Sequence, residues 1–194
     1  MKKIFIPAVI IAVLMFLPGF AFAQKLSPKE IKDGTAYYDG AELPLFGKAF
    51  EGDCANGRYR RLPARLKGVC RGALWHLGQQ SAGLYLRFRS DSPFIKAHWV
   101  STFDNRMNHM TDTGVKGLDL YFLNGGKWRF AGSGRPKGKE NEVTIVANMD
   151  REEREYMLYL SLYDGIDRIE IGIDENSGIE LPQIDSPRSG SPIV

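Results

Sequence analysis

Residues 114–130 constrain the fold more than any other stretch, because they hold two alternating segments joined by a tight turn. In the first segment Leu118, Leu120 and Phe122 recur at every second position, which is the period of a β-strand. Residues 124–126, Asn-Gly-Gly, then supply the positive φ angles that a short reversal requires. The stretch therefore predicts a β-hairpin with one apolar face.

The period of two recurs on both sides of this hairpin. Apolar residues hold every second position in residues 84–88, 95–99, 143–147, 156–162 and 169–173. Residues 74–77, Leu-Trp-His-Leu, predict a further short strand, and no amphipathic helix of useful length is predicted. Seven or more short strands joined by turns predict an all-β fold, an antiparallel β-sandwich of jelly-roll or related topology.

The first 23 residues have the pattern of a secretory signal peptide. Two lysines precede an apolar run, and Ala21-Phe22-Ala23 forms a small-x-small cleavage signature before Gln24. An uncleaved membrane anchor is the rival interpretation, but two prolines and a glycine inside the run argue against it. We therefore expect export to the periplasm or the cell exterior, with no membrane contact after cleavage.

The remaining chain, residues 24–194, has a length that suits one domain. Without Lys2 and Lys3 the formal net charge falls from +3 to +1, which gives no electrostatic case for a nucleic-acid partner. Residues 24–57 predict a leader with one or two short edge strands, and residues 58–174 hold the sandwich. Residues 175–194 are rich in Gly, Ser and Pro and predict a linker.

The two cysteines, Cys54 and Cys70, predict a disulfide in an exported protein. Such a bridge would stabilise the fold by about 3 kcal/mol in the chain-entropy model. A zinc site formed with His76 is the alternative, but its spacing is poor and it lacks a fourth ligand. The basic segment 58–71 lies inside or beside this loop and is either an anion site, for an acidic sugar or an ester carboxylate, or a solvated loop.

Motifs of catalysis are missing from the sequence. It holds no G-x-S-x-G block, no Asp-x-x-His pair, no H-E-x-x-H and no phosphate-binding loop. The three histidines, His76, His98 and His109, are dispersed. We therefore expect no catalytic residue, no metal and no cofactor in this chain, and a self-contained enzyme is not favoured.

Polar and aromatic residues near the hairpin are the candidate ligand-binding groups. His109 lies on the long loop of residues 101–113, Asp119 and Tyr121 share one strand face, and Trp128 and Arg129 lie on the return strand. In a sandwich, such rings can stack on a sugar while the charged groups take its hydroxyls. Cross-strand packing is the commoner role of such aromatics. A His109–Asp119 hydrogen bond would fasten the loop to the strand, and a catalytic pair is the alternative.

The chain resembles a known family at a set of ordered motifs. These are residues 59–63 (Tyr-Arg-Arg-Leu-Pro), 75–77 (Trp-His-Leu), 81–84 (Ser-Ala-Gly-Leu), 92–93 (Ser-Pro), 109–110 (His-Met), Gly114 and 117–121 (Gly-Leu-Asp-Leu-Tyr). They resemble the G-x-D-L-Y domain, the amino-terminal sandwich of secreted bacterial SGNH-type esterases. The resemblance covers residues 58–194, and the Cys54–Cys70 pair is not among the features that carry it.

This resemblance implies a non-catalytic module followed by an SGNH hydrolase domain. Residues 192–194 resemble the start of the first strand of such a domain. The module would pack on that C-terminal domain and help to present a carbohydrate ester. The chain lacks the catalytic Ser, the oxyanion Gly and Asn and the Asp-x-x-His of the family, so no catalytic role carries over. Two alternatives stay open: a free-standing glycan-binding module with exposed Tyr121, Trp128 and Tyr159, and an independent hydrolase using His109 and Asp119.

Overall fold

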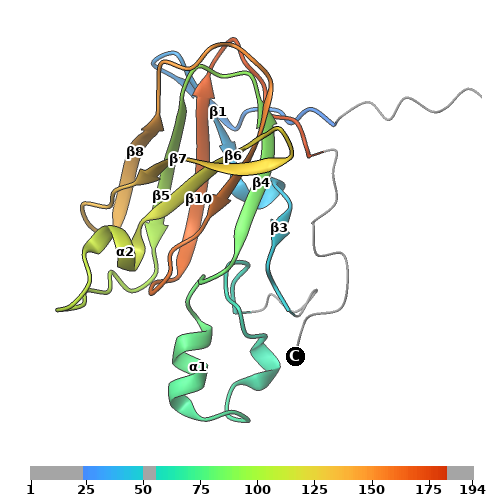
Figure 1. Cartoon of the computed structure of the whole chain (residues 1–194). Coiled ribbons are helices and arrows are strands. Elements are labelled where there is room, and N and C mark those ends of the chain that lie inside the picture. Colours follow the sequence, from blue (N-terminus) through green and yellow to red (C-terminus); the bar gives the residue numbers. More distant parts are fainter. Residues whose placement is uncertain (1–23, 50–55, 183–194) are drawn as a thin grey trace, which may run out of the picture.

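Two antiparallel sheets of five strands face each other in the structure, a computed structural model that describes residues 24–49 and 56–182 (Figure 1). The signal segment, Cys54 and residues 183–194 lie outside the described residues. The first sheet has the spatial order β1 (Glu30–Lys32), β2 (Thr35–Asp39), β10 (Ile166–Asp174), β5 (Ile95–Ser101), β8 (Glu140–Val146). The second sheet has the order β3 (Leu45–Phe46), β4 (Tyr85–Ser90), β9 (Arg154–Tyr159), β6 (Leu118–Asn124), β7 (Lys127–Gly134).

The strand pairing is that of a jelly roll. When the short edge strands β1 and β3 are set aside, eight strands remain, and the first of them pairs with the last, β2 with β10. The second pairs with the seventh, β4 with β9, and the third with the sixth, β5 with β8. The fourth and fifth, β6 and β7, close the series as a hairpin. The predicted all-β, jelly-roll sandwich is confirmed.

The core lies between the two sheets and is filled by alternate residues of the inner strands. Trp99, Phe88 and Tyr156 are its largest fully buried aromatic side chains. Aliphatic residues from both sheets complete it: Leu84, Leu86, Ile95, Leu118, Leu120, Leu158, Ile169, Ile171 and Ile173. Burial of this apolar surface is the main force that holds the two sheets together.

The predicted hairpin is present as β6 and β7, and its turn has the expected backbone. Gly125 and Gly126 have φ angles of 56° and 72°, as a two-residue type I′ turn requires. One feature of the hairpin is not visible in the sequence. Leu120 pairs with Gly132 whereas Tyr121 pairs with Phe130, so Ala131 is the extra residue of a β-bulge in β7.

Residues 74–77 form a helix, and the predicted strand there is wrong. They belong to α1 (Gly72–Gly78), which follows the short 3₁₀ helix η2 (Ala64–Leu66). A further 3₁₀ helix, η1 (Gly40–Glu42), follows β2, and α2 (Asp112–Lys116) precedes β6. Four apolar or aromatic residues span only about one helical turn, so their period could not separate a helix from a strand.

The sandwich extends beyond the predicted boundaries at residues 58 and 174. The predicted leader supplies β1 and β2 of the first sheet. β1 is the edge strand, and β2 lies between β1 and β10. Within the predicted linker, Ile179 is fully buried and packs on the core, and Glu180 forms a bridge with Arg89 of β4. Residues up to at least Ile179 therefore belong to the domain.

The predicted disulfide stays a prediction, because Cys54 lies outside the described residues. Cys70 is a half-buried thiol that donates a hydrogen bond to the carbonyl of Leu66 over 3.4 Å. Within residues 24–49 and 56–182, no helix is long and apolar enough to cross a membrane.

Candidate functional site

Asp119 and Tyr121 lie on the outer face of the second sheet, as their alternation with Leu120 predicted. The Asp119 carboxylate accepts a hydrogen bond of 2.7 Å from Ser133 on the neighbouring strand β7. His109 is exposed, and its Nδ1 lies 3.0 Å from Oδ1 of Asn108. The expected His109–Asp119 hydrogen bond is not found among the described residues: His109 lies against its neighbour Asn108, and Asp119 pairs with Ser133 across the hairpin.

The β-bulge at Ala131 decides which residues of β7 reach this outer face. Beyond the bulge, Phe130 pairs with Tyr121 and Trp128 pairs with Leu123, so both rings lie on the side of Tyr121. Arg129 pairs with Phe122 and points to the opposite side. Of the predicted ligand-binding residues, the structure therefore gathers Asp119, Tyr121 and Trp128 on one face and leaves His109 and Arg129 apart.

Five aromatic rings cross this face, one from each strand of the second sheet. We call them the aromatic row: Phe46, Tyr85, Tyr159, Tyr121 and Phe130. Successive ring centroids lie 5.4, 5.1, 5.8 and 5.6 Å apart. Four of the rings are half-buried, and Phe130 is 58% exposed at the end of the row. Such cross-strand aromatic pairs stabilise a sheet.

A buried ion pair lies beside the row on the same face. Nε of Arg87 donates to Oε1 of Glu155 over 2.6 Å, and Nη2 of Arg87 donates to the same oxygen. The guanidinium is covered by two rings: its Cζ lies 5.3 Å from the centroid of Phe46 and 5.5 Å from that of Trp128. Trp128 therefore serves to exclude water from a charge pair, which is a structural role.

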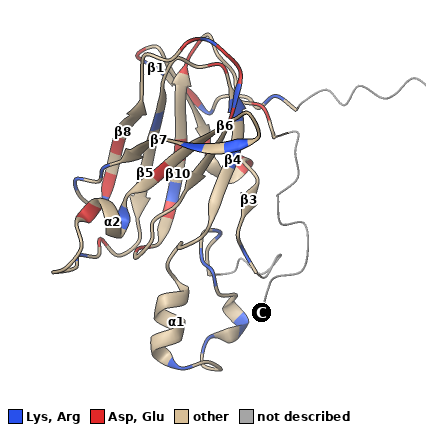
Figure 2. Ribbon diagram, in the orientation of Figure 1, with Lys and Arg blue, Asp and Glu red and all other residues tan. Residues whose placement is uncertain are grey.

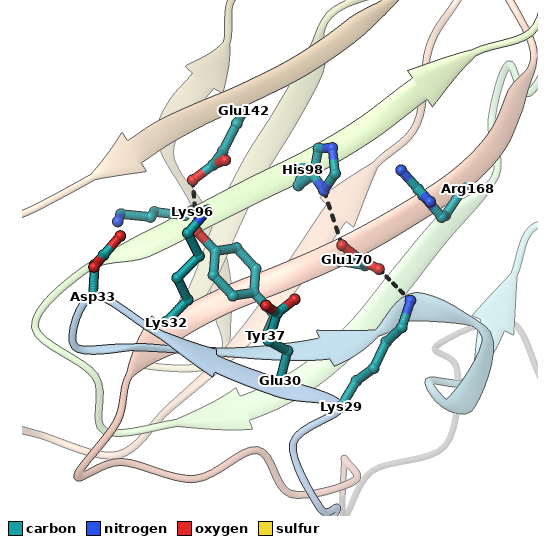
Figure 3. Close-up of a pocket in the computed structure, with 10 residues that line it drawn as sticks. All are labelled: Lys29, Glu30, Lys32, Asp33, Tyr37, Lys96, His98, Glu142, Arg168 and Glu170. Carbon is teal, nitrogen blue, oxygen red and sulfur yellow. Dashed lines mark hydrogen bonds and ion pairs between the residues drawn. The ribbon is translucent and has the colours of Figure 1, made fainter.

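A polar groove of about 500 Å³ lies over the outer face of the first sheet (Figure 3). The ring of Tyr37 lies across this face, and its hydroxyl donates to Glu142 of β8 over 2.5 Å. The ring fits because Gly172 beneath it has no side chain: a Cβ there would lie 3.0 Å from Cε1 of Tyr37. Burial and the Glu142 carboxylate raise the pKa of the Tyr37 hydroxyl.

Glu170 is the central acid of this groove. Lys29 donates to its Oε1 over 2.5 Å, and Nδ1 of His98 lies 2.9 Å from its Oε2 (Figure 3). Burial alone would raise the pKa of this carboxyl, but the hydrogen bonds from Lys29 and His98 outweigh it and hold the pKa below its usual value. Nε2 of His98 lies 3.0 Å from Glu140, so the groove is lined by groups that pair with one another.

Three segments meet at one end of the sandwich, at the bottom of Figure 1, and we call this region the loop end. They are residues 59–80, which include α1 and form the α1 lobe, residues 102–111 and residues 160–165. Arg60 fastens the lobe to the rest: its Nη1 donates to Thr102 Oγ1 over 2.6 Å and its Nη2 donates to Asp167 over 2.7 Å. His76 of α1 contacts Phe103, with 5.6 Å between ring centroids.

The other two segments of the loop end are held by a buried carboxylate. Asp164 accepts hydrogen bonds from the backbone N–H groups of Phe103 and Asn105, over 3.0 and 2.7 Å. Lys116 of α2 is fully buried and pairs with Asp104, which holds the pKa of the Asp104 carboxyl below its usual range. The loop end is therefore a hydrogen-bonded platform.

Sequence reasoning missed several members of the outer face: Phe46, Tyr85, Arg87 and Phe130. The alternation in residues 84–88 already set Tyr85 and Arg87 opposite the apolar positions, and that was the available signal. Their alignment with Tyr121 depends on the strand order of the sheet and on the bulge at Ala131, which local periodicity does not contain. Among the described residues, no group of three or more His, Cys, Asp or Glu is placed to hold a metal ion.

The sequence matches a family over residues 35–179, described as GxDLY, the N-terminus of esterases of the SGNH hydrolase type. A crystal structure from Bacteroides ovatus, described as that of a GDSL-like lipase, is similar, with 36% identity and a TM-score of 0.71. The match covers 77% of this chain and 43% of that one. A salicylyl-acyltransferase of a tetracycline biosynthetic pathway matches at 16% identity and a TM-score of 0.49, over 84% of this chain and 43% of that one. No curated protein matches the sequence.

Proposed function

The chain belongs to the GxDLY family, the N-terminus of SGNH hydrolase-type esterases, and from this we propose that it is a non-catalytic module of such an esterase. In this role the sandwich packs on a C-terminal hydrolase domain and helps to present a carbohydrate ester to it. The signal segment at residues 1–23 supports export of the module.

The observation that carries the proposal is the extent of the family match. Residues 35–179 take in nine of the ten strands, β2 to β10, and the buried Ile179, so the matched unit is the sandwich itself. The Bacteroides ovatus protein is more than twice as long as the segment it shares with this chain, since the match covers 43% of it. Its remaining length is enough for a second domain.

Glycan binding by the sandwich alone is the second candidate. It is favoured by Tyr121, Trp128 and Tyr159, which are half-buried and so leave part of each ring accessible. Against it, the ring planes of Tyr85 and Tyr159 are inclined by 48°, and those of Tyr159 and Tyr121 by 80°. A sugar stacks on a flat ring face, and rings inclined to this degree form no common plane.

The test compares three polypeptides: residues 24–194 alone, the SGNH hydrolase domain encoded downstream of them, and the two joined as the full esterase. We expect no turnover of p-nitrophenyl acetate by residues 24–194. The hydrolase domain should melt at a higher temperature when joined to the sandwich than when alone. Turnover by residues 24–194, equal melting of the hydrolase domain in both forms, or a coding sequence without an SGNH block downstream would each overturn the proposal.

A further inference from the structure

The exposed apolar residues of the sandwich are concentrated at the loop end. Seven large apolar side chains are exposed among the described residues, and five of these belong to the loop end: Val69, Leu74, Leu77, Phe103 and Leu162. The remaining two, Ile31 on β1 and Phe130 on β7, lie on separate strands. Exposed apolar residues that cluster in this way mark a surface that another molecule covers.

Helix α1 has no apolar face directed at the core. Of its seven residues only Gly78 is buried, while Leu74 and Leu77 are 46% and 45% exposed. An isolated helix of this length is not stable in water, so the hydrogen bonds of Arg60 and the contact with Phe103 hold it in place. The sandwich therefore holds in place a helix whose two leucines, Leu74 and Leu77, are exposed.

The charged residues of the α1 lobe itself have one sign. Figure 2 shows α1 itself without Lys, Arg, Asp or Glu and shows Lys and Arg on the segment before it. Arg65, Lys67 and Arg71 are exposed there, and no Asp or Glu occurs from Arg58 to Ser90. A partner that fits this surface has an apolar centre and an acidic rim.

The path of the chain after the core leads toward the same end. Glu180 pairs antiparallel with Arg89, with backbone hydrogen bonds of 2.9 and 3.0 Å. Since β4 starts at Tyr85 beside the α1 lobe and ends at Ser90, the antiparallel segment 180–182 runs back toward the loop end. In the family this domain is the N-terminus of the esterase, and the described chain leaves the sandwich in the direction of the loop end.

We infer that the loop end is the surface on which the hydrolase domain packs, with α1 at its centre and Arg65, Lys67 and Arg71 meeting an acidic rim. This inference rests on the proposed function and adds to it the contact surface. The aromatic row is the competing surface, but its rings already pack on one another and on the covered Arg87, so it is complete without a partner.

Hydrogen–deuterium exchange locates the contact directly. Amides of α1 and of residues 102–111 should exchange at least tenfold more slowly in the full esterase than in residues 24–194 alone. Amides of the edge strand β1 should exchange equally in both. Slowing over β6 and β7 in place of α1 would overturn the inference and assign the contact to the aromatic row.

Matched variants test the same contact by melting. Leu74→Ser with Leu77→Ser should lower the melting temperature of the hydrolase domain in the full esterase, as should Lys67→Glu with Arg71→Glu. Ile31→Ser, also exposed but on β1, should not lower it. In residues 24–194 alone all three variants should melt like the parent, which separates docking from folding.

The outcomes separate this inference from the proposed function. If the hydrolase domain melts independently of the sandwich in the parent esterase, the proposed function itself fails. If the two domains are coupled and the α1 variants leave that coupling intact, only the loop-end assignment fails. A third outcome is that coupling persists but the variants abolish sedimentation of residues 24–194 with phosphatidylglycerol vesicles, or break up a dimer. In that case the loop end has a different occupant, and the inference is overturned.

Discussion

Trp128 and Arg87 lie on different strands of the second sheet, and the indole covers the guanidinium with 5.5 Å between its ring centroid and Cζ. The ring of Phe46 also lies over the guanidinium, with 5.3 Å between its centroid and Cζ, and Glu155 accepts the hydrogen bonds of Arg87. This contact explains how a charged side chain on the outer face of a sheet is only 1% exposed. It also assigns Trp128 a part in stability.

Truncation of the ring should therefore destabilise the domain. Trp128→Ala removes the cover and opens the ion pair to water, and we expect a loss of about 2 kcal/mol in the free energy of unfolding. Arg129→Ala, one residue along and exposed, should change it by less than about 0.5 kcal/mol. Urea unfolding of both variants measures the difference, and equal values would assign Trp128 no structural role.

Removal of Arg87 alone should lower the free energy of unfolding more than removal of both Arg87 and Glu155. Arg87→Ala leaves the Glu155 carboxylate buried without its partner, and we expect a loss of about 3 to 5 kcal/mol. The double variant Arg87→Met, Glu155→Leu removes both charges and keeps the volume, so it should recover most of that loss. Chemical denaturation of the two variants and the parent decides; a double variant as unstable as Arg87→Ala contradicts the expectation.

Close packing at the loop end makes Gly165 sensitive to a single methyl group. A Cβ there would lie 2.1 Å from Nη1 of Arg60 and 2.9 Å from the carbonyl oxygen of Gln79, so the Arg60 hydrogen bonds would have to shift. We expect Gly165→Ala to destabilise the domain by about 1 to 3 kcal/mol. Gly138→Ala, where a Cβ meets nothing within 4 Å, is the control, and calorimetric melting of both compares them.

Burial raises the pKa of the Tyr59 hydroxyl to about 12, and this predicts a loss of stability in alkali. The unfolded chain releases the phenolic proton near pH 10, whereas the folded domain keeps it until about pH 12. Rising pH in this window therefore favours the unfolded state, by about 2 to 3 kcal/mol for Tyr59 alone. Below pH 10 the contribution is fully present.

Tyr59→Phe isolates this effect from the other titrating groups. Urea midpoints measured from pH 9 to pH 12 should fall less steeply for Tyr59→Phe than for the parent. The burial-raised pKa values of Tyr38 and Tyr156 contribute equally to both proteins and cancel in the comparison. Parallel pH profiles for the two proteins would show that Tyr59 does not titrate as described.

Local alternation was enough to predict most of the strands and the fold class. Residues 95–99 bury every second side chain and became part of β5, and the alternating isoleucines of residues 169–173 became part of β10. The hairpin was readable because Gly125 and Gly126 identify its turn. The inner position of β2 was not readable in this way, because four consecutive residues, Thr35 to Tyr38, are buried and show no alternation. One face of the strand packs on the core, and Tyr37 on the other face lines the polar groove.

The candidate surfaces depend on relationships between segments distant in the sequence. Tyr85 and Tyr159 lie 5.1 Å apart because β4 pairs with β9 in a register that no local pattern specifies. Likewise, Arg60 reaches Asp167 only because the lobe folds back on the start of β10. The sequence could predict on which face of its own strand each side chain lies. It could not predict which side chains contact each other, because the strand order determines that.

The pairing of the first long strand with the last determines when this domain can form. Thr35 pairs with Asp174, and β10 lies between β2 and β5 in the middle of the first sheet. A chain emerging from a ribosome therefore cannot complete this sheet until β10 has followed, and contacts so distant in sequence slow folding. Until then β2 and β5 present unpaired edges to other chains, so the nascent domain is exposed to aggregation until its final strand arrives.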